Sequence, residues 1–127
     1  MRAKAEAIQS ISGLGDVCAL TLLAYLPEIG TVSIKEIATL AGGTPYNRDS
    51  GNFRDYRHVI GGRSKLRSAL YMGAMSAIRF NPIMKEFYNR LVEENHRPKK
   101  VALVAVMRKL LIAANYSVKK SDFMLAN

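Results

Sequence analysis

The chain has a single cysteine, no continuous apolar stretch at its N-terminus and few acidic residues. Cys18 has no partner for an internal disulfide, and its apolar surroundings favour a small buried side chain in a reducing compartment. The N-terminus lacks the features of a signal peptide. The most apolar segment, residues 101–114, contains Arg108 and Lys109 and falls short of the ~20 residues needed to cross a bilayer. We therefore expect a soluble, cytoplasmic protein without a membrane partner.

Acidic side chains are outnumbered by basic ones, 10 to 19, which leaves a net charge of +9 on 127 residues. Such an excess on a short chain favours an anionic partner, with nucleic acid as the leading candidate. An acidic membrane surface, or a basic protein without an anionic partner, is the alternative. The excess is uneven, because residues 1–42 carry a net charge of −1 whereas residues 43–79 and 80–127 each carry +5. The basic partner surface is expected in the second and third of these segments.

The spacing of apolar residues predicts a mainly α, compact domain that covers residues 1–127. An apolar content of 49% is enough for one core. The last helix should be the one around which the others pack, because its residues 101–114 are apolar on nearly all sides. Helices are expected over residues 4–10, residues 17–26, a short segment capped by Ser33 and Glu36, residues 63–79, a segment opened by Asn81 and Pro82, and a segment opened by Pro98.

The turn at residues 12–15 separates the first two predicted helices and has the form of a helix-hairpin-helix. Gly13 and Gly15 would let backbone amides approach a phosphate at a helix N-terminus. Asp16 opposes this role, because its carboxylate lies where the phosphate would arrive. The alternative, which the local charge favours, is a glycine turn that allows two helices to pack closely.

Residues 43–62 are rich in glycine, asparagine, aspartate and arginine and show no helical period, which predicts a long basic loop with a short hairpin around residues 53–60. Ser50 precedes a glycine and could present its hydroxyl as a nucleophile. From the residues alone, the interpretation of Ser50 as an ordinary turn residue is stronger. Six basic residues could hold a phosphodiester around it, namely Arg48, Arg54, Arg57, Arg63, Lys65 and Arg67. Ser64 is expected to cap the helix that starts at residue 63.

Short motifs along nearly the whole chain resemble, in order, the C-terminal domain of the Piv/MooV-type insertion-sequence transposases, also called bridge-RNA-guided recombinases. One of them is Pro45-Tyr46-Asn47-Arg48-Asp49-Ser50-Gly51, and the motifs together are far more specific than any one of them. The others lie at residues 11–15, 26–30, 40–42, 57–58, 61–63, 69–72, 76–79, 81–82, 87–88, 99–105 and 107–111.

The resemblance implies that Ser50 is the nucleophile that becomes joined to a DNA phosphate. It also implies an N-terminal RuvC-like domain with four acidic metal ligands, which this sequence lacks. We assign no metal site and no cofactor to the present chain, and expect a divalent metal ion in the RuvC-like domain. DNA, a guide RNA and further copies of the protein are the implied partners.

These observations divide the chain into a helix-hairpin-helix-like part (residues 1–42), a basic serine loop (43–62), a helical core (63–116) and a tail (117–127). The expected function is DNA binding and serine catalysis in DNA cleavage and rejoining, with little catalysis by this chain alone. A non-catalytic nucleic-acid-binding module, or an assembly module that pairs through helices 63–79 and 101–116, is the alternative.

Overall fold

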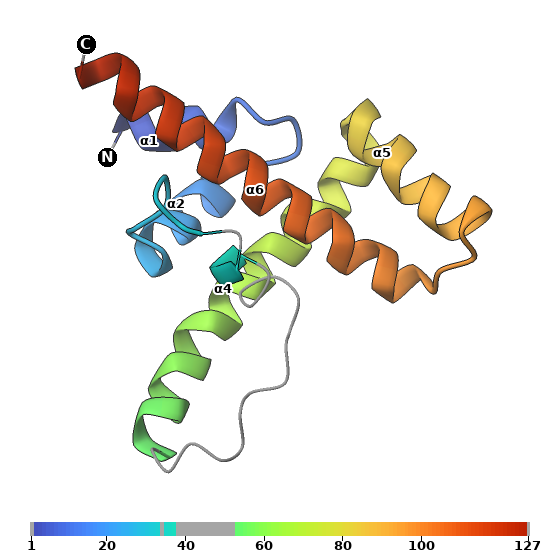
Figure 1. Ribbon diagram of the computed structural model, residues 1–127, viewed down its shortest axis with the longest axis horizontal. Helices are drawn as coiled ribbons and strands as arrows, with labels where there is room; N and C mark the ends of the chain where they lie inside the picture. The colour runs from blue at the N-terminus through green and yellow to red at the C-terminus, as the bar shows by residue number, and fades with distance from the viewer. Residues whose placement is uncertain (1, 34, 38–52, 127) are drawn as a thin grey trace.

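The computed structural model describes the backbone of residues 2–33, 35–37 and 53–126, and these residues form helices joined by turns, with no strand among them (Figure 1). This confirms the expected mainly α fold. The elements are α1 (Arg2–Gln9), α2 (Asp16–Tyr25), α4 (Phe53–Phe80), α5 (Pro82–Asn89), the π-helical η1 (Arg90–Glu94) and α6 (Lys99–Ala126), and residues 35–37 are helical as well.

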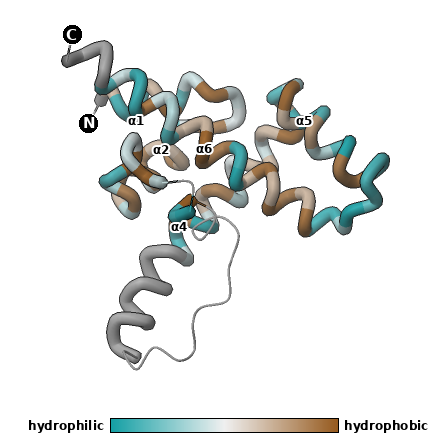
Figure 2. Tube along the Cα trace, viewed as in Figure 1, coloured by the Kyte–Doolittle hydropathy of each residue, from teal (hydrophilic) through white to brown (hydrophobic). Residues whose placement is uncertain are grey.

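Helix α6 lies at the centre of the fold, as its sequence predicted. It contacts α1, α4, α5 and η1, and hydrophobic residues recur along it, interrupted by hydrophilic ones (Figure 2). Its Lys99–Asp122 segment is long and apolar enough to cross a membrane by length and composition, but a helix that forms the core of a fold has the same composition, and α6 packs against four other helical elements. The buried side of α6 consists of Ala102, Val106, Met107, Leu110, Leu111, Ala114 and Val118.

Close approach between the N-terminal turn and α4 depends on two glycines. Gly13 has a φ of +105°, and a Cβ there would lie 2.8 Å from the Cα of Ala77. A Cβ on Gly73 would lie 2.6 Å from the Cδ2 of buried Leu14. Because neither position carries a side chain, the turn and α2 can pack directly on α4. This is the arrangement that the packing interpretation of the glycine turn requires.

Asn81 joins three elements through its side chain. Its Oδ1 accepts hydrogen bonds from the backbone N–H groups of Ile83 and Met84, at 3.1 and 3.3 Å, and so caps α5, with Pro82 in the first turn. Its Nδ2 donates to the carbonyl of Ser12 at 3.0 Å. The predicted start of this helix is confirmed, and the same residue holds the N-terminal turn against the junction of α4 and α5.

Asn115 plays a similar part on α6. Its Oδ1 accepts from the backbone N–H groups of Gly30 and Val32, at 2.7 and 3.3 Å, and its Nδ2 donates to the carbonyl of Val32 at 3.0 Å. One residue later, Ser33 Oγ accepts from the N–H of Glu36 at 3.2 Å, which confirms the predicted N-cap. The chain that leads into residues 35–37 is thus fastened to the central helix.

Three expectations about element boundaries were wrong. Residues 53–62 form the first turns of α4 instead of a loop with a hairpin. The glycine pair at residues 61–62 costs about 2 kcal/mol relative to alanine, but a helix already packed through residues further along gains a hydrogen bond for each residue added. Ser64 therefore lies inside a helix and does not cap it. Residues 117–126, taken as a tail, continue α6, because Val118 extends the buried side one turn beyond Ala114.

Replacing Gly13 with alanine should lower the free energy of unfolding by about 2–4 kcal/mol, because the new Cβ would meet the α4 backbone in a conformation that L residues rarely adopt. Gly15→Ala is the matched control: nothing lies within 4 Å of a Cβ there, so the cost should stay below about 1 kcal/mol, from the weaker N-cap. Urea denaturation of both variants measures the difference. Equal losses would contradict the close packing of Gly13 on α4.

Candidate nucleic-acid interface

The predicted phosphate-binding residues are distributed along α4, whose first turns project away from the other helices (Figure 1). Side chains are described for Lys65, which is exposed, and Arg67, which is half-buried. Arg54, Arg57 and Arg63 lie on the described backbone of α4, and their side chains lie outside the described residues. Arg48 and Ser50 lie outside the described residues altogether.

The register of α4 separates these basic residues into two groups. At 3.6 residues per turn, Arg54, Arg57 and Lys65 fall along one side of the helix, whereas Arg63 and Arg67, four residues apart, fall along another. The first side is opposite to the one that packs in the core through Leu66. By helical register alone, these basic residues therefore fall on two sides of α4, and their role in phosphate binding stays a prediction.

Lys65 lies at a groove between α2 and α4 with a volume of about 560 Å³. Its Nζ is 5.6 Å from the centroid of the Tyr25 ring, a cation–π contact that draws the ammonium group toward α2. The other residues that line the groove are mainly apolar: Val17, Cys18, Thr21, Tyr25, Ser68, Ala69 and Met72. The groove suits an apolar group next to an anion, a role that sequence reasoning did not assign to Tyr25 or Met72.

Cys18 lines the same groove as Lys65, but its environment makes its thiol inert. Burial raises the pKa of the Cys18 thiol to about 11, and its Sγ donates to the carbonyl of Ala69 at 3.4 Å. A protonated, buried thiol is a poor nucleophile at neutral pH. The expected role of Cys18 as a small buried side chain agrees with this placement.

The two glycines of the helix-hairpin-helix-like turn have different surroundings. Gly13 is closed off by α4, as described above, which favours the packing role. Gly15 is exposed at the N-cap of α2, with Asp16 in the first helical turn. Phosphate binding by Gly13 and Gly15 stays a prediction, and the carboxylate of Asp16 opposes it.

Ser64 lies among Arg63, Lys65 and Arg67 and is a second hydroxyl that could act as a nucleophile. It is exposed in the middle of α4, directly before Lys65. Within the described residues, no three carboxylate, imidazole or thiol groups gather as metal ligands. The divalent ion implied by the resemblance stays a prediction about a separate domain.

Comparison with known proteins relates the chain to DNA-rearranging proteins of one kind. Residues 5–89 match the model of the transposase IS116/IS110/IS902 family. The pilin gene-inverting proteins of Moraxella lacunata and Moraxella bovis are each 33% identical to the chain over 124 residues, which is 94% of this chain and 38% of the relative. The chain thus spans little more than a third of these relatives. No solved structure matches the chain.

The Cys18 thiol should react slowly with a disulfide reagent in the native protein at pH 8, because with a pKa of about 11 only about one thiol in a thousand is ionised. The rate should rise about tenfold per pH unit between pH 8 and 10. The chain unfolded in guanidinium is the control, and there the reaction should be fast. Equal rates in the native and unfolded states would show that Cys18 is accessible and ionised.

Proposed function

Because the chain belongs to the transposase IS116/IS110/IS902 family, we propose that it is the DNA-binding, serine-bearing domain of an insertion-sequence transposase. It would act in DNA strand cleavage and rejoining together with a RuvC-like domain outside this chain. The observation that carries the proposal is the extent of the family match, since residues 5–89 include Ser50 and the six basic residues from Arg48 to Arg67. The names of the two relatives describe proteins that invert a pilin gene, which is a rearrangement of DNA.

The proposed reaction is a transesterification at Ser50. The hydroxyl oxygen attacks the DNA phosphorus, its proton passes to a base, and the phosphorus–oxygen bond to one deoxyribose breaks as that oxygen takes up a proton. The strand end is then held as a phosphoserine ester, and the reverse reaction with a second strand rejoins it. Arginine side chains near Ser50 would stabilise the negative charge on the non-bridging oxygens.

Helix α4 supplies the proposed DNA contact. From Arg54 to Arg67 it extends for about 20 Å at the usual rise of an α-helix. By register, Arg54, Arg57 and Lys65 fall on the side of α4 away from buried Leu66 and would follow one strand of a duplex. Arg63 and Arg67 fall instead on the side of buried Leu70 and Ala74. Contacts of this kind are to phosphates and are independent of sequence.

An assembly role is the second candidate, and exposed apolar side chains on α2 and α4 favour it. Val17 and Met72 line the groove at Lys65 and are each more than half exposed, as is Leu20 elsewhere on α2. An exposed apolar patch of this kind is typical of a protein contact surface.

We propose that the full-length protein forms homo-oligomers, binds a guide RNA and acts in the cytoplasm. Its divalent ion would be held by the RuvC-like domain.

Binding of duplex DNA to the chain should weaken steeply as salt rises, because phosphate contacts release counterions. Lys65→Gln should reduce the slope of log affinity against log salt by about 0.9, the value for one lost phosphate contact. Lys85→Gln, an equal charge change on α5, is the matched control and should leave the slope unchanged. Fluorescence anisotropy of a labelled duplex at several salt concentrations measures this. A slope that is the same for wild type and Lys65→Gln would remove Lys65 from the interface.

Ser50→Ala should abolish strand joining by the full-length protein while leaving DNA binding nearly intact, because only the hydroxyl is lost and every basic group stays. The measurement is the yield of a protein–DNA adduct that resists denaturant. Ser64→Ala is the paired variant, since Ser64 is exposed on α4 among basic residues. Loss of the adduct in Ser64→Ala alone would reassign the nucleophile, and an unchanged yield in both variants would refute the serine mechanism.

A further inference from the structure

The solvent side of α6 carries a surface that the proposed function does not use. It lies opposite the buried side of the helix, and its members recur at spacings of three and four residues, which place them along one side of an α-helix. We call it the cationic face of α6, and define it as Arg108, Lys109, Ile112, Tyr116, Lys119 and Lys120, all of which are exposed.

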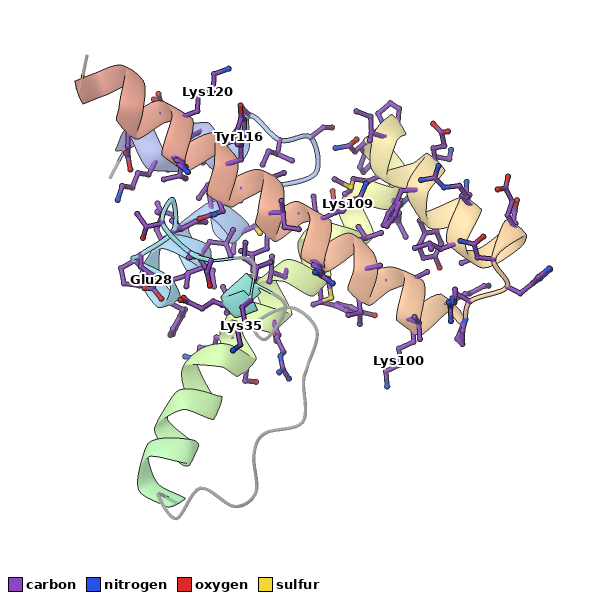
Figure 3. The ribbon with its side chains drawn as sticks, viewed as in Figure 1. Glu28, Lys35, Lys100, Lys109, Tyr116 and Lys120 are labelled. Atoms are coloured by element: carbon purple, nitrogen blue, oxygen red, sulfur yellow. The ribbon has the colours of Figure 1, made fainter. Side chains whose placement is uncertain are left out.

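Large apolar groups on this face are exposed to an unusual degree between its cations. The side chain of Tyr116 is 65% exposed and that of Ile112 is 39% exposed. Tyr116 and Lys120 project from the same side of α6, whereas Lys100 projects from the other side (Figure 3). Tyr116 lies four residues after Ile112 and four before Lys120, so ring, alkyl group and ammonium group adjoin one another.

The acidic content of α6 itself does little to neutralise this face. The one acidic residue of α6 within its described side chains is Asp122, whose Oδ2 lies 3.5 Å from the position of a Cβ on Gly30. Asp122 is therefore directed toward the turn that Asn115 fastens, and away from Tyr116. At the other end, the Nζ of Lys109 lies 4.2 Å from the centroid of the Phe87 ring, which positions that ammonium group beside α5.

The combination of charge and ring decides what the face would bind. A second copy is disfavoured, because two such faces would bring eight like charges together. Duplex phosphates would satisfy the cations but leave Tyr116 and Ile112 without a partner. A single strand satisfies both, because its phosphates pair with ammonium and guanidinium groups while an unpaired base stacks on an exposed aromatic ring.

We propose that the cationic face of α6 binds single-stranded DNA, with one unpaired base stacked on Tyr116 beside Ile112 and the backbone phosphates held by the four cations. From Lys109 to Lys120 the face extends for about 16 Å along the helix, enough for several nucleotides of an extended strand. DNA is the strand type to expect, because the chain belongs to a transposase family. The surface shares no residue with the contact proposed on α4 and does not depend on Ser50.

The test is anisotropy of labelled oligothymidylate with the whole 127-residue chain. Tyr116→Ala should weaken binding about tenfold, within the range for loss of one base-stacking contact, whereas Tyr116→Phe should retain it because the ring is kept. Tyr71→Ala, which removes a half-exposed ring from α4, is the matched control and should have no effect. Since Tyr116 is exposed, the variants should keep the wild-type circular dichroism spectrum and melting temperature. If Tyr116→Ala alters the spectrum or the melting temperature, two other comparisons decide the outcome. One is Tyr116→Phe against wild type, and the other is the pair of lysine variants described below.

A charge variant provides the second arm. The double substitution Lys119→Gln and Lys120→Gln should lower the salt slope for oligothymidylate by about 1.4, twice the single-strand value per phosphate. Lys99→Gln with Lys100→Gln changes the net charge equally near the start of α6 and should lower the slope by less. Equal effects of the two double variants, or no effect of Tyr116→Ala, would overturn the proposal. The proposal would also be overturned if oligothymidylate binding did not depend on Tyr116 while binding of duplex DNA, oligouridylate or anionic vesicles did.

Discussion

Burial of one side of α6 is the interaction on which the rest of the molecule depends. Its alanines, Ala102 and Ala114, are fully buried between larger residues such as Leu110 and Val118, so neighbouring helices approach closely and their apolar surface leaves water. Helices α1, α4 and α5 each use α6 as their common support. The same packing fixes which side of α6 stays in solvent, and therefore determines that its lysines and Tyr116 are presented together.

Two asparagines convert this packing into a defined arrangement of chain segments. Asn81 fastens the N-terminal turn to the junction of α4 and α5, and Asn115 fastens the turn at Gly30 and Val32 to α6. In each, the side-chain amide oxygen accepts and the amide nitrogen donates a hydrogen bond. Backbone groups that a turn would leave without a hydrogen-bond partner are therefore paired. The chain that enters the Ser50 segment is held by Asn115, and the chain that leaves it joins α4, which packs on the same core.

Local signals in the sequence were sufficient for several elements. Asn81 with Pro82, and Ser33 with Glu36, have side-chain chemistry that satisfies the first amides of a helix wherever it occurs, so both starts were predicted correctly. The glycine pair at residues 61–62 led to the wrong prediction of a loop, because glycine has a low helix propensity. The packing of Leu66 and Leu70 further along α4 outweighs that low propensity. The extension of α6 through Val118 was missed because its buried face follows α1, which is distant in sequence. Lys65 was predicted as a phosphate contact, but its pairing with Tyr25 of α2 required the tertiary structure.

The sequence by itself determined the helical class, the central position of the last helix, the basic character and the transposase family, because these follow from composition, from spacing along one helix and from short motifs in order. Only the tertiary structure decided that Gly13 is pressed against Ala77, that Lys65 lies beside the Tyr25 ring of α2, and that Tyr116 stands exposed among lysines. Each of these depends on which side of a helix its neighbours cover. That choice is made by contacts between residues far apart in the chain, and the spacing within any one helix does not contain it.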